Sequence, residues 1–471
     1  MECSLFHATH YQYGPACAYK ERELNSTSPK SVLAYYPLGS GKTLSAIHAA
    51  RIFLNSNPTG KVCVITTKSN IQTSWSKNIQ QYVDAEDINL ERIDVRNIDW
   101  WFSEENLPHY NKVIRLLASK SANNRAAYVD LPWRTLLRSV STKTQHQFKA
   151  MDDGLNRSFL DACVPEGRFM FIVDECQQYL NTTSHQQLVA TLCKHAYFTI
   201  LLSATPLNDS AQELGLCRML RSRNLENRIL FVPRQENMVD VKHRYIGVKM
   251  TPEEISNYVQ NKRDDAYLTK GRQLCNTETK FTKILNKIGK RTVVYSFFRE
   301  NGAEGFFTFL LNQTQSKSKS KYYLTFTIHS RKIHVKIFSN PEEDIQWFNR
   351  ASSKNKILLI TSKAQLGISL IGVDTFHIME PQWSYADEAQ AVGRVTRMGS
   401  HVKNQTVTVF HWVSTAGKYE TSDEIVHNSM QTKKKRTDHI LRQYADMGTR
   451  YLSQLLDKFR VFNTTTILIN E

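Results

Sequence analysis

The stretch that most constrains the fold is residues 36–43, with the sequence YPLGSGKT, between an apolar run at 31–35 and a helix-like run at 44–53. A strand, a glycine-rich turn and a helix in this order are typical of a phosphate-binding loop. Glycine lets the backbone turn tightly and direct its N–H groups at phosphate oxygens, and the helix start adds positive charge. We expect Lys42 to reach the β- and γ-phosphates and the Thr43 hydroxyl to bind Mg²⁺. Tyr36 stands where the GxxxxGK[ST] pattern has its first glycine, and a chance turn is the alternative. The phosphate-binding residues predicted here are Gly39, Ser40, Gly41, Lys42 and Thr43.

Length and composition indicate a globular protein of more than one domain. A chain of 471 residues is longer than chains that usually fold around a single hydrophobic core, so two or three domains are expected. The net charge of +17 favours a polyanionic partner, nucleic acid before a membrane, although a basic soluble protein is the plainer alternative. The eight cysteines show no CxxC spacing, so neither a zinc site nor a disulfide framework is predicted. No apolar stretch approaches 18 residues and no signal peptide is recognisable, so an intracellular, soluble protein is expected.

Two adjacent carboxylates follow the apolar run 169–173 and predict the second half of a nucleotide site. Asp174 would hold Mg²⁺ directly or through water, and Glu175 would orient and deprotonate the attacking water. Acidic pairs at strand ends are frequent, so this pair alone does not indicate a nucleotide site. Together with the phosphate loop it does, because ATP hydrolysis needs both the phosphate-binding loop and the carboxylates. Near the N-terminus, the Gln12 amide is suited to an adenine edge, although a polar helix start would look the same.

Polar residues also end other apolar runs. The run 61–66 leads to Thr67 and Lys68, which suit contacts with a phosphate backbone, since ligands of open α/β sheets bind at the carboxyl ends of strands. The run 197–202 leads to Ser203 and Thr205, which could relay the state of the γ-phosphate, or form a plain turn. Residues 90–168 contain no motif that we recognise.

The second half of the chain starts a new set of α/β elements. Thr251 and Pro252 form a favourable N-cap and N1 pair, so a helix is expected to begin there. The run 291–298 contains Ser296, and the run 356–360 leads to Thr361, Ser362 and Gly367. Further on come Trp383 and Gln390. Gly393 would let the backbone approach a neighbour closely. Arg394 and Arg397 are three residues apart and would share one helix face, where they could neutralise a transferring γ-phosphoryl group; a solvated arginine pair is the alternative.

Taken in order, these blocks resemble the motifs of superfamily-2 helicases and translocases. The resemblance covers most of the chain and looks closest to the Swi/Snf-like group, which includes poxvirus-type nucleoside triphosphate phosphohydrolase I and helicases of cytoplasmic DNA viruses and linear plasmids. Gln177 replaces the histidine of the DExH box, and Gln365 stands where many relatives have glycine. The matching segments are 39–43, 66–68 with Trp75, 174–177, 203–205, 294–296, 361–370 and 390–397.

The resemblance implies an α/β fold of two tandem RecA-like domains with parallel sheets flanked by helices, at about 1–230 and 240–471. It implies ATP and Mg²⁺ in the cleft between them, and a nucleic-acid-dependent ATPase that moves along or unwinds DNA in viral-type transcription or replication. The alternatives are an RNA helicase or a nucleotide-regulated binding subunit with a vestigial ATPase. A polymerase or transcription complex would be the partner, in the cytoplasm of a host cell or in a virion, with the nucleus as a further possibility.

The resemblance also assigns site residues. The catalytic set is Lys42, Asp174, Glu175, Gln177, Arg394 and Arg397, with Thr43 and Asp174 on the metal. Gln12, Gly367 and Gln390 join the phosphate loop in binding ATP. The nucleic-acid contacts are Thr67, Lys68, Ser203, Thr205, Ser296, Thr361, Ser362 and Trp383.

Overall fold

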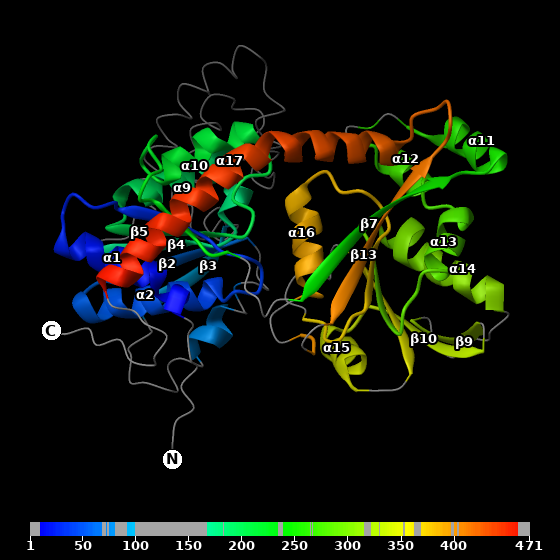
Figure 1. The fold of residues 1–471 in the computed structure, drawn as a ribbon, viewed down its shortest axis with the longest axis horizontal. Helices are drawn as coiled ribbons and strands as arrows, with labels where there is room; N and C mark the ends of the chain where they lie inside the picture. Colours follow the sequence, from blue (N-terminus) through cyan, green and yellow to red (C-terminus); the bar gives the residue numbers. More distant parts are fainter. Residues whose placement is uncertain are drawn as a thin grey trace, which may run out of the picture.

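The described residues form two β-sheets, each flanked by helices, that lie side by side (Figure 1). The computed structural model describes residues 10–459 apart from 68–71, 73–74, 81–91, 99–166, 182, 234–238, 264, 266, 315–321, 329, 352–353, 362–368, 397–399 and 403–404. In the described residues no helix is both long and apolar enough to cross a membrane.

The first sheet has the strand order β3-β2-β4-β5-β1-β6, and all its pairings are parallel. Its inner strands are rich in apolar residues and almost completely buried because helices cover both faces, and β4 is apolar over its whole length. The strands β1 and β4, which precede the glycine-rich loop and the acidic pair, lie on either side of β5. The strands are β1 (Ser31–Tyr35), β2 (Lys61–Thr66), β3 (Ile93–Asn97), β4 (Phe169–Val173), β5 (Phe198–Ser203) and β6 (Ile229–Phe231).

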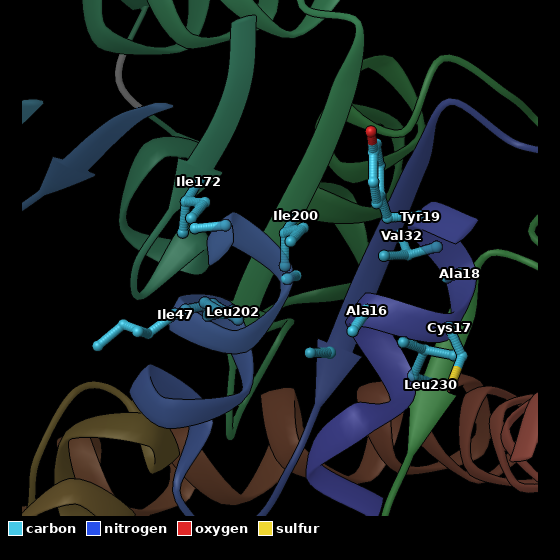
Figure 2. Packing of buried hydrophobic residues seen from close by; sticks show 14 of the residues in the cluster. Ala16, Cys17, Ala18, Tyr19, Val32, Ile47, Ile172, Ile200, Leu202 and Leu230 are labelled. Carbon is cyan, nitrogen blue, oxygen red and sulfur yellow. The ribbon is translucent and has the colours of Figure 1, made fainter. Parts of the chain in front are cut away.

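Two apolar clusters hold helices against the two faces of this sheet. In Figure 2, Ala16 and Tyr19 from one helix lie beside Val32 of β1, and Ile47 from the next helix lies beside Leu202 of β5; all five belong to one apolar cluster. The opposite face is covered by leucines and valines of two further helices. The helical elements of this part are η1 (His10–Tyr13), α1 (Gly14–Leu24), α2 (Lys42–Ser56), η4 (Cys176–Tyr179), α9 (Thr183–His195), η5 (Ser210–Gln212) and α10 (Glu213–Met219).

The second sheet has the order β7-β13-β12-β8-β11-β10-β9. All its pairings are parallel except that of the β9–β10 hairpin, which adds an antiparallel edge. The strands are β7 (Asp240–Lys249), β8 (Arg291–Ser296), β9 (Tyr323–Ile328), β10 (Arg331–Ile337), β11 (Asn355–Thr361), β12 (Thr375–Ile378) and β13 (Thr406–Thr415).

Helices again cover both faces of the second sheet. The expected start at Thr251 is confirmed, because its side chain accepts from the Glu254 N–H in a capping box. One apolar cluster includes Phe281 and Phe306, and the other includes Phe348 and Ala391. The helices are α11 (Pro252–Asn261), α12 (Thr269–Leu274), α13 (Glu278–Leu285), η6 (Arg299–Glu304), α14 (Gly305–Thr314), α15 (Pro341–Asn349) and α16 (Tyr385–Gly393).

One long helix, α17 (Ser422–Lys458), crosses from the second sheet to the first (Figure 1). It begins in the second half with a capping box at Thr421, and its carboxyl-terminal turns join the core of the first half through Leu452 and Leu455. A Cβ added to Gly448 would lie 2.6 Å from the Phe231 Cβ, so only glycine allows the helix to rest on β6 this closely.

The expected fold class, two RecA-like α/β units, is confirmed. The strands divide between β6 and β7, close to the boundary proposed between 230 and 240. The domain ranges themselves stay a proposal, and α17 contacts elements on both sides of that boundary, β6 in the first sheet and β13 in the second.

Candidate active site

The glycine-rich loop has the backbone that its sequence predicts. Gly39 and Gly41 have φ angles of 80° and 83°, in the region that residues with a Cβ rarely adopt. Gly41 is the N-cap of α2, so Lys42 and Thr43 form the first turn of this helix. The helix N-terminus and the loop amides therefore point to one anion-binding position.

The N-terminal segment η1 packs against this loop and explains the unusual residue at position 36. The Gln12 Nε2 atom donates to the Ser40 carbonyl oxygen at 2.9 Å. The fully buried Tyr36 donates its hydroxyl to the Tyr11 carbonyl oxygen at 3.0 Å. Tyr36 thus joins the end of β1 to the segment that carries Gln12, and the predicted adenine-binding residue lies beside the phosphate loop.

The carboxylate of Asp174 is held in a fixed orientation at the end of β4. Its Oδ2 atom accepts from the Trp75 indole N–H at 2.8 Å, and Oδ1 accepts from the Glu175 backbone N–H at 3.0 Å. Burial and the adjacent Glu175 raise the pKa of the Asp174 carboxyl to about 6, while the Trp75 hydrogen bond and the Lys42 charge oppose the rise. Lys42 and Asp174 are therefore close enough to interact electrostatically.

A chain of hydrogen bonds links the acidic pair to β5. Glu175 adopts a left-handed backbone conformation, with φ of 49°. Its Oε2 atom accepts from the Gln177 Nε2 atom at 2.7 Å, and the Gln177 Oε1 atom accepts from the Ser203 hydroxyl at 2.6 Å. Gln177 therefore performs a donor-and-acceptor role that a neutral amide keeps at every pH, unlike the histidine of related sequences.

The second half of the chain reaches this site through α16. The Gln390 Nε2 atom donates to the Glu175 Oε2 atom at 3.2 Å, so one carboxylate oxygen accepts hydrogen bonds from both halves of the protein. At the end of α16, a Cβ added to Gly393 would lie 2.6 Å from the Leu38 Cδ1 atom in the glycine-rich loop. The expected close approach at Gly393 is confirmed.

The arginines depart from expectation in one respect. Helix α16 ends at Gly393, and Arg394 is its C-cap, so Arg394 does not lie on the face of a helix that continues to position 397. The prediction of a shared helix face was wrong, because 3.6-residue periodicity gives no information about where a helix ends. Arg397 lies outside the described residues.

The predicted nucleic-acid contacts differ in exposure. Ser203 and Ser296 are fully buried and Thr205 is nearly so, so contact with a polynucleotide would need a change of conformation. Thr67, Thr361 and Trp383 are partly exposed. Lys68, Ser362 and Gly367 lie outside the described residues.

The donor set fits a nucleoside triphosphate with Mg²⁺. The Thr43 hydroxyl and the Asp174 carboxylate are the hard oxygen ligands that this ion prefers, and the two oxygens of Asp174 keep lone pairs beyond those used by Trp75 and Glu175. In the described part of the chain, no group of three or more acidic, histidine or cysteine side chains could hold a metal unaided. Such a site therefore relies on phosphate oxygens and water for the remaining ligands.

Two RecA-like units whose site contains a phosphate loop, an acidic pair and a glutamine from the opposite unit define the class of two-domain helicases. The family model described as "Type III restriction enzyme, res subunit" matches residues 11–208, and that described as "Helicase conserved C-terminal domain" matches 276–399. The two models together span most of the chain, which is similar to the superfamily-2 helicases and, in its curated relatives, to their Swi/Snf-like group.

Curated relatives agree with this family. A killer plasmid pGKL-2 helicase of Kluyveromyces lactis is 27% identical over 237 residues, 43% of this chain and 38% of that protein. A putative ATP-dependent RNA helicase of Acanthamoeba polyphaga mimivirus is 31% identical over 136 residues, 26% of this chain and 22% of that protein. A DNA repair and recombination protein RAD54-like of Gallus gallus is 28% identical over 123 residues, 26% of this chain and 16% of that protein. The chain thus spans less than half the length of each. The crystal structure of the DUF1998 helicase MrfA bound to DNA covers 95% of this chain and 55% of its own, with a TM-score of 0.48 and 11% identity.

Proposed function

We propose that this protein is a nucleic-acid-stimulated ATPase that hydrolyses ATP between its two domains, at about 1–230 and 240–471, and moves along or unwinds DNA. The observation that carries the proposal is the pair of hydrogen bonds on the Glu175 Oε2 atom, one from Gln177 at 2.7 Å and one from Gln390 at 3.2 Å. A catalytic base that is held by both domains can respond to their relative position. This arrangement is what coupling between hydrolysis and movement requires.

Binding of the triphosphate is assigned to the first domain. The amides at Gly39 and Gly41, with the α2 N-terminus and Lys42, would surround the phosphates. Thr43 and Asp174 would hold Mg²⁺, which would neutralise phosphate charge when bound. Gln12, which donates to the Ser40 carbonyl oxygen, would contact the adenine base.

Deprotonation of water is assigned to Glu175. Its Oε2 atom is occupied by two amide donors, which leaves Oε1 to accept the proton of an attacking water. Because Gln177 also accepts from Ser203 at the end of β5, a shift of the base moves the neighbouring strand end as well. Arg394, directly after α16, is proposed to complete the site with Arg397 when the domains close.

DNA is the polynucleotide that we propose, with RNA as the competing ligand. The charge of +17 supports a polyanion of either kind. The matches to a RAD54-like DNA repair protein and a killer plasmid helicase favour DNA, whereas a mimivirus relative is described as an RNA helicase. We also propose a polymerase or transcription complex as the partner, in the cytoplasm of a host cell.

The test is a panel of steady-state ATPase assays with no polynucleotide, single-stranded DNA, duplex DNA and RNA, at rising salt. We expect DNA to stimulate turnover, and the stimulation to fade as salt rises because phosphate contacts release counterions. Greater stimulation by RNA would replace the DNA assignment. Equal rates in all four conditions at low salt would contradict a nucleic-acid motor.

A further inference from the structure

The carboxyl end of β8 presents an aromatic ring to the outside of the second domain. Phe297 is 44% exposed and directly follows Ser296, the last residue of β8. Ser296 is paired in register with Thr361, the last residue of β11. Phe297 therefore lies at the carboxyl edge of the second sheet, where open α/β sheets bind their ligands.

The backbone at this position is fixed by a buried carboxylate. The Phe297 N–H donates to the Glu380 Oε2 atom at 3.0 Å, and the Ser296 hydroxyl donates to Oε1 at 2.5 Å. Glu380 is fully buried just beyond β12, the neighbour of β8 on its other side. Two adjacent strands thus determine where Phe297 stands, so the ring is oriented before any ligand arrives.

A buried cation supports the ring from within. The Arg272 guanidinium carbon lies 5.1 Å from the ring centroids of both Phe297 and Phe298. Arg272 is only 2% exposed, its Nη2 atom donates to the Pro381 carbonyl oxygen at 2.8 Å, and its Nε atom has no hydrogen-bond partner among the described residues. Burying a guanidinium costs hydration free energy, and contact with the aromatic faces offsets part of that loss. The inner side of the Phe297 ring therefore rests on the buried Arg272 side chain.

We propose that Phe297 stacks against a nucleobase of an unpaired polynucleotide strand. The inference rests on the proposed function and deepens it, because it names single-stranded nucleic acid as the ligand of this edge. Every base has a π face, so stacking needs no particular sequence and contributes about 1–3 kcal/mol per base. Bases inside a duplex already stack on one another, so the contact favours an unpaired strand.

The test measures the affinity of the full chain for a fluorescent single-stranded DNA oligonucleotide by anisotropy. Phe297→Ala is expected to weaken binding about 5- to 150-fold, the range that corresponds to one lost stacking contact. Phe297→Trp is expected to bind close to wild type, whereas Phe297→Leu, apolar but without a π face, is expected to resemble the alanine variant. Ile371→Ala is the matched control. Ile371 is an exposed apolar residue whose carbonyl accepts from Arg291 at the opposite end of β8, and its substitution is expected to leave affinity unchanged.

An oligonucleotide with abasic sites separates stacking from a structural effect. Wild type is expected to lose affinity when bases are removed, and Phe297→Ala to lose much less, because its contact is already gone. Equal losses in the two proteins, or tight binding by Phe297→Leu, would overturn the inference while the ATPase assignment stands. If wild type binds no polynucleotide and its ATPase is not stimulated, both the inference and the proposed function fail.

Discussion

The contact between Gly393 and Leu38 gives the sharpest test of how the two domains meet. A methyl group at position 393 would lie 2.6 Å from the Leu38 Cδ1 atom and 3.0 Å from its Cβ. Carbon atoms in contact prefer about 3.5–4.0 Å, so Gly393→Ala overlaps the phosphate loop by about 1 Å. Overpacking of this kind costs about 1–3 kcal/mol.

The overlap exists only while the two domains are in contact. Gly393→Ala therefore destabilises the conformation that hydrolyses ATP, and leaves the fold of each domain unaffected. We expect Gly393→Ala to lower kcat for ATP hydrolysis about 5- to 150-fold, with an unchanged unfolding midpoint. Leu38→Ala removes Cδ1 and Cγ and leaves only the Cβ contact at 3.0 Å, so the double variant should recover part of the loss and give a coupling energy of the opposite sign. Gly247→Ala is the control, since a Cβ there meets nothing nearer than 3.9 Å. A Gly393→Ala enzyme with wild-type turnover, or a double variant no faster than the single one, would refute the reasoning.

The remaining predictions concern the hydrogen bond between Gln390 and Glu175, the buried His377 in the second domain, and Gly448 in α17. Gln390→Ala removes the cross-domain hydrogen bond and should slow turnover about tenfold, measured by steady-state kinetics at saturating ATP. Burial lowers the pKa of His377 to about 3, so the unfolded chain takes up one more proton below pH 6.5. The free energy of unfolding should then fall by about 1.4 kcal/mol per pH unit from pH 6 to 4, and His377→Asn should flatten this slope in urea titrations; an unchanged slope would contradict the assignment. Gly448→Val would bring its side chain against Phe231 and should destabilise the protein by about 1–3 kcal/mol in urea unfolding, with Gly247→Ala again as the neutral control.

Local sequence patterns were sufficient for much of the fold. The apolar run 169–173 predicts β4 at the bounds that the structure has, the run 291–298 predicts where β8 begins, and the cap at Thr251 predicts where α11 begins. These features depend on neighbours in sequence, through hydrophobic periodicity, capping and the conformational freedom of glycine.

Contacts between distant segments could not be predicted in this way. The Ser296 hydroxyl donates to Glu380, which lies beyond β12, and Gln390 donates to Glu175, which is 215 residues away in the chain. Neither contact follows from a local pattern. Tyr36 looked like a defect in the loop motif, although its hydroxyl holds the segment that carries Gln12. Helix α17 begins in the second half and packs on the core of the first, and no local pattern indicates this.

The central claim is that Glu175 is the base of an ATPase that polynucleotide stimulates. The most direct measurement is ATP turnover by wild type and Glu175→Gln, each with and without single-stranded DNA at low salt. Wild type should be stimulated, and the glutamine variant, which keeps the shape of the side chain but cannot accept the proton, should be slower by about 10²- to 10⁴-fold in both conditions. Full turnover by Glu175→Gln, or a wild-type rate that DNA leaves unchanged, would contradict the account.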